Sequence, residues 1–497
     1  MWRHWMPVAT AGLGLLVVFV PLDTLLSIAQ RASPSGALLP KTVLLIQALR
    51  VVLPSLGAML GCWLVLPVKL AKAVSRCVSR VLDAPWAPLA VVVVGVLVRL
   101  VWLLVYPTQP YADSQWYLDS ATRLAQGYGY ALDTSGGTPT AAWPPGYPWL
   151  LSILFRLVGP GQRVALALNV PLGGLSIWLT FALGARWYSR RVAVLASLAI
   201  ALLPGLVVYT SLINSDILFL CLALAALAIA SQGGDRRAFW WQAVALGVLL
   251  AAAGLTRSLG MALLPVAALT RYAASGRPHF ARTLRWTMLA GVTMALCILP
   301  WSIRNYHAFG RPVLISTNGG LNFWMGNNPG AGGAYYGPSD PDLNPLLAFA
   351  GDERALDEAG YRFGLEFVRA HPRRVVALWP AKVFYLYNSN DGGVYWNQRS
   401  ALRPLQFGTG PEAYWLTNLI HALLLALVAM GIADLVFARQ RLTRWLPVIF
   451  VLWWTLLHLP FFGADRFGLP ALPMFAMLGA SGLLLLLHRP EAEAPDR

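Results

Sequence analysis

The chain has 497 residues, of which 57% are hydrophobic and only 12% are charged, and its mean hydropathy is +0.59. This composition excludes an ordinary soluble protein, because soluble domains carry about 25% charged residues. The net charge of +17 would suit a nucleic-acid partner, but the basic residues lie mostly in short loops between apolar runs. Membrane topology and anionic lipid head groups explain such loops, so no nucleic-acid partner is expected.

Apolar runs near the length that spans a bilayer, about 20 residues each, recur almost from end to end. They predict an all-α polytopic membrane protein, a bundle of about twelve spans at 5–28, 42–66, 86–107, 163–184, 191–209, 213–231, 239–256, 258–271, 286–304, 413–437, 445–462 and 468–487. The loops rich in Lys and Arg alternate along the chain, which places them and both termini in the cytoplasm. We expect the first span to be retained rather than cleaved as a signal peptide.

Two long polar segments set the expected organisation of the chain. We predict two extra N-terminal spans with a cytoplasmic loop at 1–85, a core bundle at 86–304, an outer-side lid or subdomain at 305–412, C-terminal spans at 413–487 and a disordered tail at 488–497. The first outer loop, 108–162, lies within the core bundle. Functional residues are expected in this loop and in the lid, because loops carry most binding and catalytic groups.

The first outer loop begins with a predicted helix that Asp113 opens and Gly127 ends. Two interpretations of Asp113 remain open from the residues alone. As an N-cap it would stabilise the first turn by about 1 kcal/mol. As a carboxylate at the membrane boundary it would accept a proton from a hydroxyl nucleophile. Tyr117 shares its helical face, and the Pro-Pro-Gly-Tyr-Pro turn at 144–148 leads into an apolar run that suits an interfacial helix.

This order of features resembles the GT-C glycosyltransferases, especially relatives of family 39 such as protein mannosyltransferases and the aminoarabinose transferase of lipid A. The features are a span followed by Asp-x-x-x-Tyr at 113–117, a Gly-x-Gly turn at 127–129, and Pro-Pro-Gly-Tyr-Pro before an interfacial helix. Pro-Trp-Ser-Ile-Arg-Asn-Tyr at 300–306 and Asp-Arg-Phe at 465–467 are also similar to bacterial members. The resemblance covers residues 86–487.

The resemblance implies a GT-C-like bundle in which Asp113 is the catalytic base and Arg466 lies near a lipid phosphate. Two positions depart from the aminoarabinose enzymes, which carry a second acid after the aspartate and a lysine before the prolines. Ser114 and Trp143 stand at these places here. The phosphate contacts of those enzymes therefore cannot be copied onto this chain.

Ionisable residues lie at the predicted outer ends of several spans: Asp216, Arg257, Arg304, Lys382, His458, Asp465 and Arg466. Guanidinium groups match phosphate oxygens through forked, charge-assisted hydrogen bonds. We therefore predict that the donor phosphate and its lipid are bound by Arg257, Arg304, Lys382 and Arg466. The alternative is that these groups snorkel to the interface or pair with one another. Arg99 lies inside a span and needs a partner within the bundle.

Sugar or acceptor recognition is predicted for a set of aromatic, amide and acidic residues: Tyr117, Asp216, Asn322, Trp324, Asn327, Asn328 and Tyr335. An aromatic belt with asparagine turns, and a capping role for Asp216, are the alternatives. The histidines and the four cysteines show no spacing of a metal site or a disulfide framework. No metal or cofactor is therefore demanded, although assistance by a divalent cation stays open.

The sequence and its resemblance together predict a GT-C hexosyl- or pentosyltransferase. It would move a sugar from a polyprenyl-phosphate donor to a hydroxyl of a lipid, glycan or protein, with inversion, on the outer face of the bacterial cytoplasmic membrane. Its partners would be the lipid-linked sugar, membrane lipids and the acceptor. The alternatives are a transporter or flippase of lipid-linked saccharides, a ligase that moves whole saccharides from a diphosphate carrier, and a noncatalytic scaffold. The sequence names neither the sugar nor the acceptor.

Overall fold

The computed structural model describes residues 68–133, 137–233, 236–275, 280–402, 411–438 and 440–487. Every named element in this part of the chain is a helix, accompanied by three isolated bridges. The predicted all-α fold is therefore confirmed. The two predicted N-terminal spans at 5–28 and 42–66 and the tail at 488–497 lie outside the described residues.

Six helices of the described chain are long and apolar enough to cross a membrane: α5 (Ala87–Val105), α8 (Gln162–Trp187), Ala238–Thr256 within α12 (Arg236–Thr256), α14 (Phe280–Phe309), Glu412–Phe437 within α19 (Pro411–Phe437), and Asp465–Leu487. The last of these comprises α21 (Asp465–Gly468), η4 (Leu469–Ala471) and α22 (Leu472–Leu487). The protein is thus a multi-pass membrane protein.

Four of the predicted spans differ from a single long helix. The span predicted at 191–209 is a pair, α9 (Arg190–Leu202) and Pro204–Ser211, bent by 59°. The spans predicted at 213–231, 258–271 and 445–462 are shorter apolar helices. They are α11 (Asp216–Ala230), the pair η2 (Ser258–Leu263) and α13 (Leu264–Ala274), and α20 (Leu442–His458). The total of twelve spans stays a prediction.

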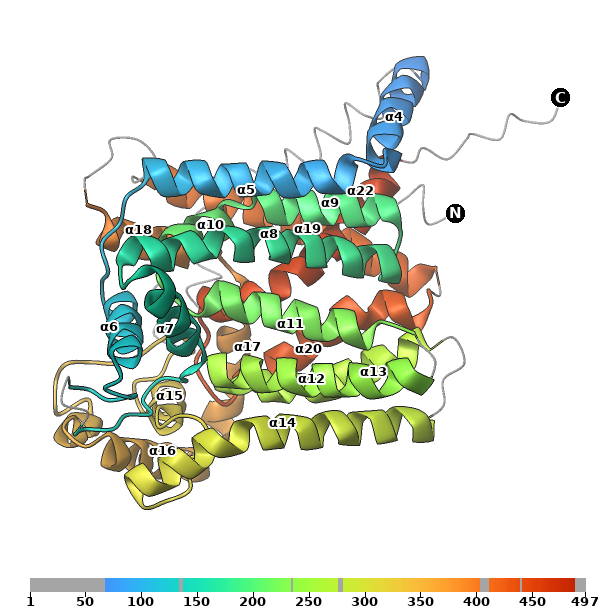
Figure 1. Ribbon diagram of the computed structural model, residues 1–497. Coiled ribbons are helices and arrows are strands. Elements are labelled where there is room, and N and C mark those ends of the chain that lie inside the picture. The colour runs from blue at the N-terminus through green and yellow to red at the C-terminus, as the bar shows by residue number, and fades with distance from the viewer. Residues whose placement is uncertain are drawn as a thin grey trace.

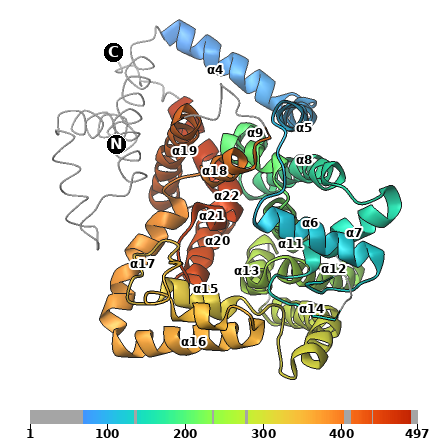
Figure 2. The same cartoon turned by 90° about the vertical axis from the view of Figure 1, so that its left-hand side faces the viewer.

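The long helices run side by side with the shorter α11 among them, and several other short helices lie at the two ends of the bundle (Figure 1). One end, here called the α6 end, carries α6 (Asp113–Gln126), α7 (Gly146–Val158), α15 (Gly319–Gly326) and α16 (Glu353–Ala370). The opposite end, here called the α4 end, carries α4 (Val68–Asp83). Figure 2 looks onto the α6 end, where α21 lies near the middle between α17 (Pro372–Tyr387) and the α6–α7 pair.

The first outer loop packs through a small aromatic core of its own. Tyr117 of α6 stacks edge-on against Tyr147 of α7, with 5.3 Å between the ring centroids, and Leu151 and Phe155 are buried beside them. Helix α6 ends at Gly127, whose φ of +90° suits glycine, as the sequence predicts. Burial of this aromatic face fixes the first turn of α6, and with it Asp113, against the bundle.

Arg99 stabilises the break between α9 and α10 (Pro204–Val207). Pro204 has no backbone N–H, so the last carbonyls of α9 lose helical donors. The Arg99 guanidinium, which is buried, donates to the carbonyl oxygens of Ile200 and Ala201, each at 2.9 Å. These are the internal partners that an arginine within a span requires. The second half of the bent pair ends with η1 (Val208–Ser211), and residues 212–215 connect it to Asp216 at the start of α11.

Candidate active site

Asp113 occupies the first helical position of α6, and Ala112 occupies the N-cap without a side-chain capping bond. Ala112 has a φ of +50°, which is strained for a residue with a Cβ and is shared by no other non-glycine residue of the described chain. Such strain concentrates at functional sites. The Asp113 carboxylate does not serve as the N-cap of the helix. Instead, its Oδ2 accepts a hydrogen bond from Arg466 Nη1 at 2.8 Å.

Four charged side chains from distant parts of the sequence form one continuous chain of ion pairs, here called the charge cluster: Asp113, Arg466, Asp216 and Arg257. Arg466 Nε donates to Asp216 Oδ2 at 2.9 Å. Arg257 Nη1 lies 2.7 Å from Asp216 Oδ1. Asp216 therefore holds both guanidinium groups, and Arg466 bridges the two carboxylates.

The four side chains of the charge cluster differ in how far they are exposed to solvent. The Asp216 side chain is 0% exposed, those of Arg257 and Arg466 are 17% and 20% exposed, and that of Asp113 is 38% exposed. A carboxylate as buried as Asp216 is stable only with charged or hydrogen-bonding partners, and the two arginines supply them. Asp113 is the most exposed member of the charge cluster. Its second oxygen, Oδ1, makes no hydrogen bond within the described residues, so it can accept a proton from an incoming group.

Asp465 fixes the backbone that carries Arg466. Its Oδ1 accepts from Arg466 N at 2.9 Å, and its Oδ2 accepts from Gly392 N at 2.5 Å, at the first residue of α18 (Gly392–Ser400). A Cβ at Gly392 would lie 2.7 Å from Asp465 Oδ1, so this approach requires glycine. The segment between α17 and α18 is thereby tied to the charge cluster.

Tyr117 lies beneath the charge cluster rather than at its surface. Its side chain is buried, and its hydroxyl lies 3.2 Å from Ser215 Oγ, next to Asp216 in the sequence. Burial raises the pKa of the Tyr117 phenol, so it stays protonated. Tyr117 therefore supports the wall of the site, and its predicted contact with a sugar stays a prediction.

Two predicted phosphate ligands lie apart from the charge cluster. Arg304 donates to the carbonyl oxygens of Thr140 at 2.8 Å and of Tyr130 at 2.5 Å, so it clamps the first outer loop onto α14. Lys382 is buried in α17, which is not among the span-like helices, and its Nζ donates to Leu459 O at 2.9 Å. Burial lowers the pKa of this ammonium group to about 8. The role of both as phosphate ligands stays a prediction.

The predicted sugar-binding set divides by exposure. Trp324, Asn327 and Asn328 are buried, and the Asn328 amide donates to Trp324 O at 2.9 Å within its own turn. Asn327 Nδ2 donates to Pro460 O at 2.6 Å, which joins α15 to the end of α20. Asn322 is partly buried, and the Tyr335 ring is exposed. Of this set, only Asn322 and Tyr335 present surface to an incoming molecule in this state.

Glu353, which no sequence motif marks, is a second organising residue at the α6 end. Its Oε2 accepts from Thr140 Oγ1 at 2.7 Å, its Oε1 accepts from Ala141 N at 2.7 Å, and Thr317 Oγ1 donates to the same oxygen. The residue stands at the start of α16, where an acidic side chain is ordinary. No local signal therefore marks its long-range partners. Through it, the segment at 305–402 holds the first outer loop.

The described residues contain no group of three or more His, Cys, Asp or Glu side chains placed to hold a metal ion. Cys77, Cys221 and Cys297 are free thiols. The cation between Asp113 and Asp216 is the Arg466 guanidinium. This arrangement defines the class of site as a charge cluster at one end of a membrane-embedded helical bundle, with one solvent-facing carboxylate.

Residues 142–303 match the family model described as dolichyl-phosphate-mannose-protein mannosyltransferase. The matched stretch contains α7, Asp216 and Arg257, but not Asp113 or Arg466. The predicted resemblance to GT-C glycosyltransferases is confirmed over these residues. No curated protein matches the chain.

Several solved structures are similar to this chain. Among them, the oligosaccharyltransferase of Archaeoglobus fulgidus in the apo form has a TM-score of 0.49 and 14% identity, covering 81% of this chain and 50% of that protein. The archaeal oligosaccharyltransferase AglB of Archaeoglobus fulgidus in complex with an inhibitory peptide and a dolichol-phosphate has a TM-score of 0.47 and 15% identity, covering 80% of this chain and 50% of that protein. ArnT of Cupriavidus metallidurans bound to undecaprenyl phosphate has a TM-score of 0.39 and 16% identity, covering 81% and 77%. This chain spans about half the length of the oligosaccharyltransferase.

Proposed function

We propose that the protein is a membrane glycosyltransferase that moves a sugar from a polyprenyl-phosphate donor to an acceptor hydroxyl, with Asp113 as the general base. The observation that carries the proposal is the charge cluster. It pairs a solvent-facing carboxylate with a guanidinium group in a chain whose residues 142–303 match a family of lipid-phosphate-sugar transferases. A base and a phosphate-binding cation within 3 Å of each other are the two groups that this reaction needs.

The proposed transfer is a single displacement at the anomeric carbon of the donor sugar. Asp113 Oδ1 takes the proton of the acceptor hydroxyl while the hydroxyl oxygen forms a bond to the anomeric carbon. The bond from that carbon to the phosphate oxygen breaks, and its electron pair leaves with the polyprenyl phosphate. Attack opposite the leaving group inverts the anomeric centre. The proton on Asp113 then passes to solvent, which reaches this partly exposed side chain.

Arg466 has donors for both the base and the leaving group. Its Nε and Nη1 are bound by Asp216 and Asp113, while its Nη2 makes no hydrogen bond within the described residues. Arg257 likewise uses one nitrogen for Asp216. The remaining donors of these two arginines are proposed to bind the donor phosphate and to stabilise the charge that develops as it leaves. Asp216 keeps both groups aimed at that position.

The proposed orientation places the α6 end on the outer face of a bacterial cytoplasmic membrane. Basic residues gather at the opposite end, where Arg80, Arg190, Arg191 and Arg444 lie at helix ends. Basic loops are retained in the cytoplasm, which supports this orientation.

We also propose Arg304 and Lys382 as secondary contacts to the donor phosphate. Asn322 and Tyr335 are proposed to contact the sugar or the acceptor.

The test uses the full-length protein, reconstituted in lipid vesicles with a radiolabelled extract of bacterial polyprenyl-linked sugars. Two variants are compared, Asp113→Asn and the control Asp119→Asn. The control removes a carboxylate from the same helix, one that only accepts a hydrogen bond from Gln115. We expect release of free polyprenyl phosphate and label transfer with the wild type and the control, but not with Asp113→Asn. Movement of intact donor across the vesicle membrane by all three proteins would overturn the proposal and indicate a transporter.

A further inference from the structure

Two buried tyrosine hydroxyls near the charge cluster make no hydrogen bond within the described residues. They belong to Tyr147, in the first turn of α7, and to Tyr209, in η1. The Tyr147 residue is 0% exposed and Tyr209 is 1% exposed, so solvent does not reach either ring. A buried hydroxyl without a partner destabilises the folded state, and such groups are rare in native proteins. Two of them in one place therefore call for a functional explanation.

Tyr209 lies beside both the start of α18 and the charge cluster. Its ring packs directly on the backbone of Gly393, where a Cβ would lie 2.8 Å from the Tyr209 Cε2 atom. The Tyr209 hydroxyl interacts electrostatically with Asp216, and also with Arg466 and Arg257. It is therefore an unused hydrogen-bond donor next to the most buried carboxylate of the site.

Tyr147 approaches the same carboxylate from a different element. Helix α7 begins at Gly146, where a Cβ would lie 2.8 Å from Thr256 Oγ1, and Thr256 directly precedes Arg257. The first turn of α7 is therefore packed against the end of α12. The Tyr147 hydroxyl interacts electrostatically with Asp216. Two unused donors, from α7 and from η1, thus lie near one carboxylate.

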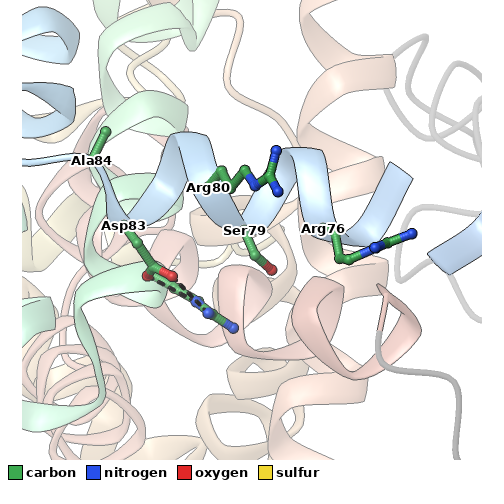
Figure 3. A pocket seen from close by; sticks show the side chains of 6 residues that line it. Arg76, Ser79, Arg80, Asp83 and Ala84 are labelled. Atoms are coloured by element: carbon green, nitrogen blue, oxygen red, sulfur yellow. Dashed lines mark hydrogen bonds and ion pairs between the residues drawn. The ribbon is translucent and has the colours of Figure 1, made fainter. Parts of the chain in front are cut away.

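The Asp216 carboxylate has an oxygen that can accept from these hydroxyls. Its Oδ1 lies 2.7 Å from Arg257 Nη1, yet it accepts no well-aligned hydrogen bond within the described residues. The ion pair of Asp83 with Arg191, which lines a pocket of about 540 Å³ at the α4 end, is a contrast (Figure 3). There both carboxylate oxygens accept aligned hydrogen bonds from Arg191, at 2.9 and 2.6 Å. Asp216 Oδ1 is held by charge alone.

Binding of the donor would change what Asp216 needs. The proposed function places the donor phosphate on the remaining donors of Arg257 and Arg466. A second anion on the same two guanidinium groups draws part of their interaction away from Asp216. Because this side chain is 0% exposed, water cannot make up the loss. Hydrogen bonds from the two phenols can.

We infer that Tyr147 and Tyr209 are positioning residues of the donor site, whose hydroxyls donate to Asp216 when the donor phosphate is bound. Asp216 then stays in place, and it keeps Arg257 and Arg466 aimed at the phosphate. The two hydroxyls add little to the stability of the protein alone and strengthen the complex with the donor. The inference rests on the proposed function, because it concerns the arginines that are proposed to bind the phosphate.

The test compares Tyr209→Phe and Tyr147→Phe with the matched control Tyr188→Phe. Each change removes one hydroxyl and keeps the ring. The Tyr188 hydroxyl donates to Arg444 O at 2.6 Å at the α4 end, so the control loses a hydrogen bond away from the charge cluster. Two quantities are measured on the full-length protein in detergent: the Tm without ligand, and the Kd of undecaprenyl phosphate as the probe.

The two measurements separate a positioning role from a structural one. Without ligand, we expect both site variants to unfold at or above the wild-type Tm, because neither loses a hydrogen bond, and the control to unfold below it. We expect undecaprenyl phosphate to bind each site variant about tenfold more weakly than the wild type, and the control within about twofold. In the transfer assay the KM for the lipid-linked donor should rise similarly, with kcat nearly unchanged.

Two results would overturn the inference while the proposed function stands. One is wild-type affinity for undecaprenyl phosphate in both site variants. The other is a clear fall in their Tm without ligand, which would show that the hydroxyls are already bonded through water. Failure of the proposed function looks different, because the wild type itself would then neither bind undecaprenyl phosphate nor transfer sugar, and the inference would fall with it.

Discussion

Replacing Asp216 by asparagine tests the charge cluster at its most buried point. The Asp216 side chain is 0% exposed and holds Arg466 at 2.9 Å and Arg257 at 2.7 Å. An amide offers one acceptor oxygen, and its NH₂ group would face a guanidinium donor. Removing one partner of a buried ion pair costs about 3–5 kcal/mol. Because both arginines still reach solvent, we expect the lower end of this range, about 3 kcal/mol.

This loss of unfolding free energy is measurable as a shift in thermal unfolding. For a chain of this length, about 3 kcal/mol corresponds to a fall in Tm of roughly 3 °C. The assay is tryptophan fluorescence of the purified protein in detergent on heating, with Asp119→Asn as the reference variant. We expect Asp216→Asn to unfold roughly 3 °C below that reference. Unfolding within about 1 °C of the reference would refute the view that Asp216 holds the two arginines in place.

Three further predictions follow from the contacts around the charge cluster. The Gly392→Ala Cβ would displace the Asp465 carboxylate, so donor turnover is expected to fall at least tenfold in a protein whose helix content by circular dichroism is unchanged. Glu353→Gln weakens the charge-assisted bonds to the first outer loop by about 1.5–3 kcal/mol, and hydrogen exchange at the Ala141 amide should accelerate; an unchanged rate would contradict this. Lys382 has a pKa of about 8 in the folded protein, against about 10.4 when unfolded, so the unfolded state binds more protons between these two pH values. The free energy of unfolding, relative to that of Lys382→Met, should therefore rise with pH over this window. Chemical unfolding at several pH values measures it.

The local features of the site follow from the sequence because they depend on neighbouring residues. The start of α6 at Asp113, its end at Gly127 and the helix after the Pro-Pro-Gly turn all appear where predicted. Their signals are an acidic residue of a type common at helix starts, a glycine free to adopt positive φ, and prolines that fix a rigid turn before α7. The apolar face that buries α6 is likewise visible as periodicity.

The partners of the charged residues do not follow from the sequence, since they depend on how distant helices pack. Arg257, Arg304 and Arg466 look alike in the sequence, each beside an apolar run, yet Arg304 binds loop carbonyls and the other two bind Asp216. Asp216 looks like an ordinary helix cap, and its place between two arginines comes from the bend at Pro204 and from α21. The contacts of Glu353 are also hidden in the sequence, because its partners Thr140 and Ala141 lie 213 and 212 residues away along the chain.

The most direct measurement of the central claim is the turnover rate of Asp113→Asn at saturating lipid-linked donor, beside binding of the same donor. If Asp113 is the general base, turnover should fall by about 10²–10⁴-fold, while donor binding changes by less than about tenfold. Turnover within about tenfold of the Asp119→Asn control, with donor binding intact, would contradict the assignment of Asp113.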